Sequence, residues 1–329
     1  MTDRLTFIDE MRGIAILTVV IGHIYLPHTS EGIMHPIASI IYSFHMSFFF
    51  FISGYINQKT NKINSKGCYN FISKKATSLL IPYLFWLLIA PLFINNSFPS
   101  TIQELIARFS FFPNKHYWFL PTLFIFMMLY LIGNKLIKTN KAILLVSTLS
   151  IGCFCICGFL FHQYFLFIYG IYWFSFLFGS FLSQNKLLEE FITKKIIFGI
   201  SALLLCIAWK FYPIEINNPT WRPFLNIILS FFCSLLGSIS LLNFFRKVQL
   251  PLIIQKYLQE MGKYSLIIYV VPITLLPKDF IFSSTISATL TNLIILFIAV
   301  LQTLISYTFG RIIYEIPFLS YIMFGKKAR

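Results

Sequence analysis

Apolar segments follow one another along nearly the whole chain, and only short polar stretches separate them. Each is close to the roughly 20 residues that an α-helix needs to cross the hydrocarbon core of a bilayer. The pattern predicts an all-α, polytopic integral membrane protein with about ten transmembrane helices, in a single domain over residues 1–329. The expected spans are 7–27, 37–57, 76–94, 116–133, 142–161, 164–183, 196–213, 223–243, 262–277 and 289–314.

The loops predict the orientation of these helices. With the N-terminus in the cytoplasm, all but five of the 26 Lys and Arg residues fall on the inner side, as the positive-inside rule expects. We therefore expect both termini to be cytoplasmic. The first apolar run is also longer than the 7–15 residues of a signal-peptide core, so it is expected to remain as the first helix.

The composition excludes several other classes of protein. The chain is 57% hydrophobic and 11% charged, whereas soluble domains are about 25% charged. The net charge of +15 is spread over short loops and lacks the clustered patch of a nucleic-acid-binding protein. Cys153, Cys155 and Cys157 alternate on a helix and point about 200° apart, so no metal site and no disulfide framework is expected.

Two ionisable residues stand out in the first span. Arg12 and His23 are eleven residues apart, which places them on nearly one helix face with a rise of about 16 Å. Such groups are costly in hydrocarbon, and two on one face indicate function. Asp9, three residues before Arg12, would fix its rotamer, and the guanidinium suits phosphate groups. The alternative is that Arg12 reaches to the interface and His23 hydrogen-bonds a neighbouring helix.

The second span carries a further histidine. His45 lies about 12 Å below its outer end at Ile37, a depth similar to that of His23, so the two imidazoles suggest a shared polar cavity. A hydrogen bond that only packs helices together is the alternative for His45. Ser53 and Gly54 are expected to permit close helix packing.

Other candidate residues lie near the ends of spans. Lys74 and Lys75, at the start of the third span, would attract a phosphorylated cosubstrate or lipid headgroups, or serve topology alone. His116 and Trp118 open the fourth span from the outside. Trp there fits an interfacial belt, but it also stacks on sugar rings, so this edge could hold a carbohydrate.

Four motifs together resemble the membrane-bound acyltransferase-3 family, which includes bacterial glycan O-acetyltransferases, and its fucose 4-O-acetylase-like branch in particular. They are Phe7–Leu17 followed by Gly22-His23, Phe44–Tyr55, Trp118-Phe119-Leu120 and Gly262–Tyr269. Two positions depart from the family pattern. Ser78 stands where the second of two basic residues often occurs, the first aligning with Lys75, and Pro272 stands where a His often ends the last motif.

The resemblance implies acetyl transfer from cytoplasmic acetyl-CoA to a sugar hydroxyl of a surface or lipid-linked polysaccharide, by a multi-pass protein among the lipids of the bacterial inner membrane. Arg12 with Asp9, Lys74 and Lys75 would hold coenzyme A, and His23 would act as general base. His45 would orient His23, stabilise the oxyanion or accept the acyl group, and Trp118 and His116 would contact the acceptor. A glycan or lipid exporter without transfer activity, and a structural membrane component, are the alternatives.

Overall fold

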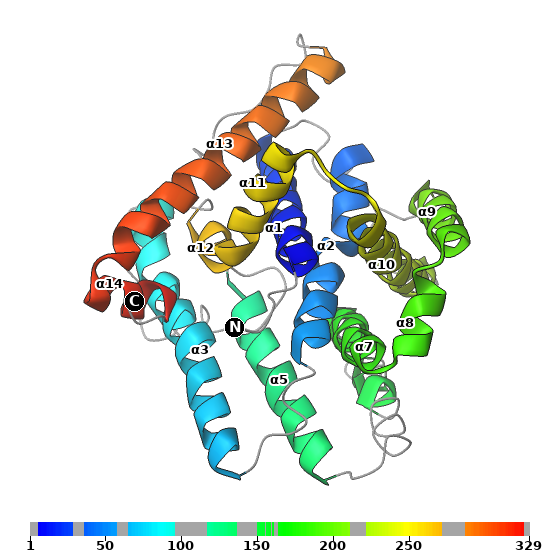
Figure 1. The fold of residues 1–329 in the computed structure, drawn as a ribbon, viewed down its shortest axis with the longest axis horizontal. Coiled ribbons are helices and arrows are strands. Elements are labelled where there is room, and N and C mark those ends of the chain that lie inside the picture. The colour runs from blue at the N-terminus through cyan, green and yellow to red at the C-terminus, as the bar shows by residue number, and fades with distance from the viewer. Residues whose placement is uncertain are drawn as a thin grey trace.

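The structure is a computed structural model. It describes residues 6–28, 36–57, 65–95, 117–136, 150–154, 156–158, 160, 164–210, 222–271 and 287–325. These residues are helices and the turns between them, without a strand, which confirms the all-α class. The helices are α1 (Thr6–His28), α2 (Pro36–Ile56), α3 (Ser65–Asn95), α5 (Phe119–Leu136), α7 (Tyr164–Gln184), α8 (Lys186–Ile192), α9 (Lys195–Lys210), α10 (Arg222–Lys247), α11 (Leu252–Lys263), α12 (Ser265–Val270), α13 (Ala288–Tyr314) and α14 (Pro317–Phe324) (Figure 1).

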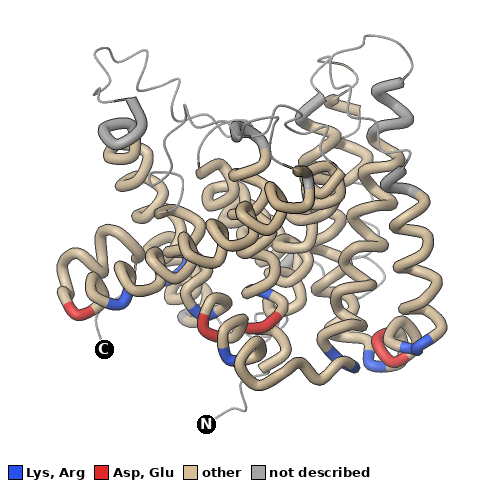
Figure 2. Tube along the Cα trace, turned by 90° about the horizontal axis from the view of Figure 1, so that it is seen from above, with Lys and Arg blue, Asp and Glu red and all other residues tan. Residues whose placement is uncertain are grey.

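The described helices confirm a polytopic membrane protein. Five of them, α2, α3, α7, α10 and α13, are long and apolar enough to cross a membrane, and α5 and α9 are shorter apolar helices. Large apolar side chains such as Leu203 on α9 and Phe297 on α13 are exposed, as lipid-facing residues are. In Figure 2 most of the charged residues gather toward one edge of the molecule. This asymmetry fits the cytoplasmic edge that the loops predict.

Helix α1 lies in the middle of the bundle and touches α2, α10, α11, α12 and α13. Its contact with α11 is unusually close. A Cβ atom on Gly13 would lie 2.1 Å from the Leu258 carbonyl oxygen, and one on Gly262 would lie 1.9 Å from the Asp9 carbonyl oxygen. The two backbones therefore touch, which only glycine permits at these two positions.

A buried carboxylate fixes the register of this contact. Glu10 is 4% exposed, and one of its oxygens accepts hydrogen bonds from the side-chain amides of Gln255 and Gln259, at 3.0 and 2.8 Å. Hydrogen bonds to a charged group are stronger than neutral ones. Since the two glutamines are one helical turn apart, Glu10 holds α11 both along and around its axis.

The sequence-based spans missed this part of the fold. Residues 252–261 were expected to form a cytoplasmic connection, but they belong to α11, which packs Leu258 and Met261 inward and exposes Ile253. The expected span 262–277 is described only to residue 271, where α12 has ended. Span 142–161 is described only in short pieces. Helix α3 begins at Ser65, well before the expected start at residue 76.

The contact between α2 and α7 also depends on glycine. A Cβ atom on Gly54 would lie 1.8 Å from the Phe176 carbonyl oxygen, and one on Gly179 would lie 2.1 Å from that of Phe51. Small residues let membrane helices approach in this way, so the close packing expected at Gly54 is present. Ser53, its neighbour, lines a cavity instead.

We expect Gly54→Ala to destabilise the protein, because the added methyl group forces α2 and α7 apart. Overpacking of this kind costs about 1–3 kcal/mol and would lower the midpoint of thermal unfolding in detergent. Gly133→Ala is the matched control, since no atom of the described residues lies within 4 Å of the position that its Cβ atom would take, and alanine favours a helix over glycine. An equal loss in both variants would contradict the role given to Gly54.

We also expect Glu10→Ala to loosen α11. The change leaves two amide donors without their carboxylate, at about 1–3 kcal/mol each, so backbone amide exchange in α11 should accelerate by about tenfold or more. Glu190→Ala, which removes an exposed carboxylate from α8, should leave that exchange rate unchanged. Equal protection of α11 in the Glu10 variant and the native protein would rule out the clamp.

Candidate functional site

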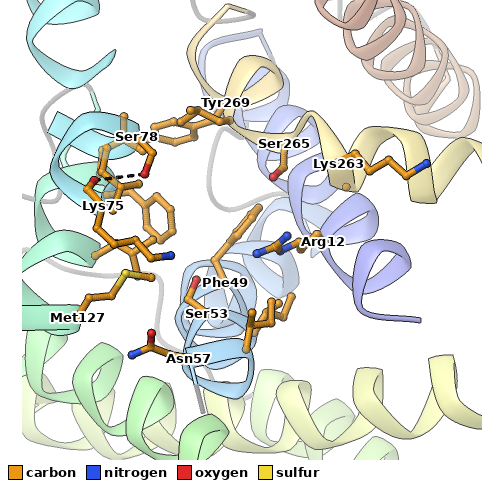
Figure 3. Close-up of a pocket in the computed structure, with 18 of the residues that line it drawn as sticks. Arg12, Phe49, Ser53, Asn57, Lys75, Ser78, Met127, Lys263, Ser265 and Tyr269 are labelled. Atoms are coloured by element: carbon orange, nitrogen blue, oxygen red, sulfur yellow. Dashed lines mark hydrogen bonds between the residues drawn. The ribbon is translucent and has the colours of Figure 1, made fainter. Parts of the chain in front are cut away.

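A cavity of about 600 Å³ opens between α1, α2, α3, α5 and the segment around α12 (Figure 3). Small-molecule sites have volumes of about 300–1,000 Å³, so this cavity can take a ligand of that size. The sequence-predicted residues Arg12, Lys74 and Lys75 all line it, and they come from two helices far apart in the chain. The structure therefore brings the predicted cations together.

Four cations surround the mouth, because Lys263 joins the other three, and no acidic residue is among the described residues that line the cavity. Figure 3 shows Arg12 and Lys75 pointing into it, whereas Lys263 points away and forms an ion pair with Glu260. Nη1 of Arg12 is 4.0 Å from Oδ1 of Asp9, whose side chain is only 5% exposed. The predicted Asp9–Arg12 pair is therefore present, with Asp9 behind the guanidinium and outside the cavity lining.

The lining changes from charged to polar to apolar with depth. On α2, Asn57 and Ser53 are followed one turn further in by Phe49, since residues four apart share a helix face. Ser78 on α3 follows Lys74 by four residues in the same way, and Ser265 begins α12 just after the turn that follows Lys263. The layer of Asn57, Ser53, Ser78 and Ser265 is called the hydroxyl–amide layer below. The inner end is apolar and includes Val19 and Met46.

His23 and His45 lie one turn beyond this inner end and do not line the cavity. His23 follows Val19 by four residues, and His45 precedes Phe49 by four, so each continues a helix face that forms the cavity wall. His45 is buried, and its Nδ1 is 2.8 Å from the Ile41 carbonyl oxygen. His23 is exposed and lies close enough to His45 to interact with it electrostatically.

The tautomer of His45 follows from its hydrogen bond. A carbonyl oxygen only accepts, so Nδ1 must carry the proton and donate it to Ile41. Nε2 of the neutral ring is then left with a lone pair. The ring of Tyr42 meets the imidazole edge to face, with 5.0 Å between centroids, and holds its orientation. His45 is thus arranged as a hydrogen-bond acceptor or base.

The predicted carbohydrate edge is only partly described. Trp118 is buried, stacks on Tyr172 with ring centroids 5.5 Å apart, and does not line the cavity. His116 lies outside the described residues. The acceptor contacts of both residues remain a prediction.

Sequence reasoning missed other features of the site. Lys263 was noted only as part of a motif, and Tyr117, just before α5, has a φ of 63° that no sequence pattern announces. Its hydroxyl donates a hydrogen bond to the Val270 carbonyl oxygen, at 3.2 Å. Among the described residues, no group of three His, Cys, Asp or Glu side chains could hold a metal ion.

Comparisons with known proteins identify the family of this chain. Residues 5–311 match the family of acyltransferase domains known as acyltransferase-3. Nodulation protein NolL of Mesorhizobium japonicum is 29% identical over 154 residues, which cover 44% of this chain and 40% of that protein. Nodulation protein NolL of Sinorhizobium fredii is 37% identical over 82 residues, or 24% of this chain and 22% of that protein.

The chain therefore spans less than half the length of these two curated relatives. No solved structure matches it. The family match nevertheless covers nearly the whole chain and includes every helix that lines the cavity. The chain belongs to the acyltransferase-3 family of multi-pass membrane proteins.

Proposed function

We propose that this protein is an O-acyltransferase of the bacterial inner membrane that moves an acetyl group from cytoplasmic acetyl-CoA to a hydroxyl of a surface or lipid-linked glycan sugar. The observation that carries the proposal is the layered cavity, whose lining runs from cations through hydroxyls and an amide to apolar side chains. Membership of an acyltransferase family supports the reaction class.

The layers correspond to the parts of coenzyme A. Its phosphates are anionic, its pantetheine arm carries amides, and its thioester end is small and weakly polar. Arg12, Lys74 and Lys75 would meet the phosphates, and the hydroxyl–amide layer would meet the arm. An amide buried without a hydrogen-bond partner costs free energy, so polar side chains at middle depth suit this donor better than an apolar tube would.

Arg12 is the residue best placed to hold a phosphate. Its guanidinium can form two parallel hydrogen bonds to one phosphate group, which a lysine cannot. Asp9 stands behind it at 4.0 Å and limits its rotamers. Lys75 is close enough to Arg12 and Lys74 for their charges to repel, so a polyanion at the mouth relieves that repulsion.

His23 would act as general base on the sugar hydroxyl. The acceptor oxygen loses its proton as it attacks the thioester carbonyl carbon of acetyl-CoA. The C–S bond then breaks, and coenzyme A leaves as a thiolate that takes up that proton. A neutral imidazole can take that proton, which contributes about 10²- to 10⁴-fold to such reactions. Arg12 and His23 are separated by a rise of about 16 Å, so phosphates held at the mouth leave the thioester near His23.

His45 would orient His23. With its Nδ1 proton given to Ile41, its Nε2 can accept a hydrogen bond from the His23 ring and favour one His23 tautomer. The same lone pair would let His45 accept the acyl group covalently. Stabilising an oxyanion requires a hydrogen-bond donor, so the neutral His45 ring suits oxyanion stabilisation least of its three possible roles.

We expect Arg12→Ala to weaken binding of acetyl-CoA to the purified protein by about 10- to 100-fold, since hydrogen bonds to charged groups contribute about 1.5–3 kcal/mol. The affinity of Arg12→Lys should lie between those of the native protein and Arg12→Ala, because lysine keeps the charge but cannot form the two parallel hydrogen bonds of a guanidinium. Calorimetric titration in detergent measures the dissociation constant. Lys186→Ala, on α8 outside the cavity, should bind normally, and unchanged binding by Arg12→Ala would refute the phosphate contact.

We expect His23→Ala to keep its affinity for acetyl-CoA but to lose acetyl transfer by about 10²- to 10⁴-fold. Mass spectrometry of the surface polysaccharide from cells with each variant measures the transfer. Thr18→Ala is the control, because Thr18 lies on the same helix and, among the described residues, its hydroxyl donates a hydrogen bond to the Ala15 carbonyl oxygen within its own helix. Undiminished acetylation in the His23 variant would exclude the base, and glycan at the surface without any new ester in the native protein would favour an exporter.

A further inference from the structure

Three aromatic rings from α2, α5 and α12 line the inner end of the cavity, where Val19 of α1, one turn before His23, also lies. Phe49 of α2, Phe119 of α5 and Tyr269 of α12 all line it, and Phe119 lies between the other two. Its ring centroid is 5.5 Å from that of Phe49 and 5.7 Å from that of Tyr269. We refer to Phe49, Phe119 and Tyr269 as the aromatic end wall. His45 is one turn beyond Phe49 on the same face of α2.

Contacts at the start of α5 hold the end wall in place. Tyr117 donates a hydrogen bond to the Val270 carbonyl oxygen, and its ring meets that of Tyr269 edge to face, with 6.1 Å between centroids. The positive φ of Tyr117 is a strained conformation, which persists only where surrounding contacts over-determine it. These contacts fix the first turn of α5 against α12. Displacing the Phe119 ring from the end wall would therefore cost free energy.

A fixed wall at this depth limits what fits in front of it. Along α5 the cavity runs from Met127 to Phe119, two turns or about 12 Å. The thioester end of the donor must come to this inner end to approach His23. Every carbon added to the acyl chain then presses against packed rings, and overpacking a rigid apolar site is unfavourable.

We propose that Phe119, braced between Phe49 and Tyr269, restricts the donor to short acyl chains such as acetyl. This inference rests on the proposed use of coenzyme A thioesters and adds the residue that sets the acyl length. A pocket of this kind typically discriminates about 10- to 200-fold for each methylene. The alternative is that Phe119 only packs helices together, as other buried rings do.

Phe126 offers a matched control for that alternative. It lies two turns from Phe119 on the same helix, is also buried, and contacts the same neighbour. The ring of Phe50 is 4.9 Å from that of Phe119 and 5.1 Å from that of Phe126. Phe126 does not line the cavity, so its removal opens space in the core but not at the end wall.

The test uses the full chain purified in detergent and measures its dissociation constants for coenzyme A, acetyl-CoA, butanoyl-CoA and hexanoyl-CoA. The native protein should bind butanoyl-CoA at least about tenfold more weakly than acetyl-CoA. Phe119→Ala should reduce that ratio by about tenfold or more, and Phe119→Leu by less. Phe126→Ala should keep the native ratio, and comparing ratios cancels any partition of the longer thioesters into micelles.

The outcomes separate the two proposals. If coenzyme A itself does not bind the native protein, the proposed donor is wrong and the length restriction falls with it. If coenzyme A binds but the ratio is the same in the native protein and in Phe119→Leu, the end wall does not select the acyl chain. A Phe119→Ala variant that fails to fold leaves Phe119→Leu and the milder Phe49→Leu to decide, and an equal shift in Phe126→Ala would also overturn the proposal.

Discussion

The backbone contact between α1 and α11 is the constraint on which the site depends. Gly13 and Gly262 let the two helices touch, and Glu10 fixes their register through Gln255 and Gln259. The same turn of α1 carries Asp9 and Arg12. Because α12 follows α11 directly, the clamp sets the position of Ser265 and Tyr269 relative to Arg12 in the lining of the cavity.

The charge on that cavity agrees with the orientation that the loops predict. In that orientation Arg12, Lys74 and Lys75 lie at the cytoplasmic edge, where basic residues are favoured. The lining has no acidic residue among those described, and the charge of Arg12 is only partly offset by Asp9 behind it. Further in, where water is scarce, the lining turns to hydroxyls and then to rings, which avoids burying unpaired charge.

Part of the fold and of the site could be predicted from residues that are unusual in a membrane helix. These residues are a guanidinium and imidazoles in apolar segments, lysines at a span boundary, and a glycine in a phenylalanine-rich run. What could not be predicted arises from pairing between distant segments. Residues 252–263 have the pattern of an amphipathic helix, but nothing local indicates that it docks on α1, and the partners of Glu10 lie more than 240 residues away. The φ of Tyr117 and the end wall around Phe119 likewise depend on α12, which the apolar pattern placed within one long span.

Arg12, Val19 and His23 share one face of α1, and this limits which insertions and deletions the helix can accept in evolution. Inserting or deleting one residue between Arg12 and His23 would rotate one end of the helix by about 100° relative to the other and turn the imidazole away from the axis, although no side chain had been exchanged. Only length changes near whole turns keep both ends aligned. The number of residues between Arg12 and His23 is therefore more strongly constrained than their identity. The apolar residues between them are free to vary wherever packing tolerates the change.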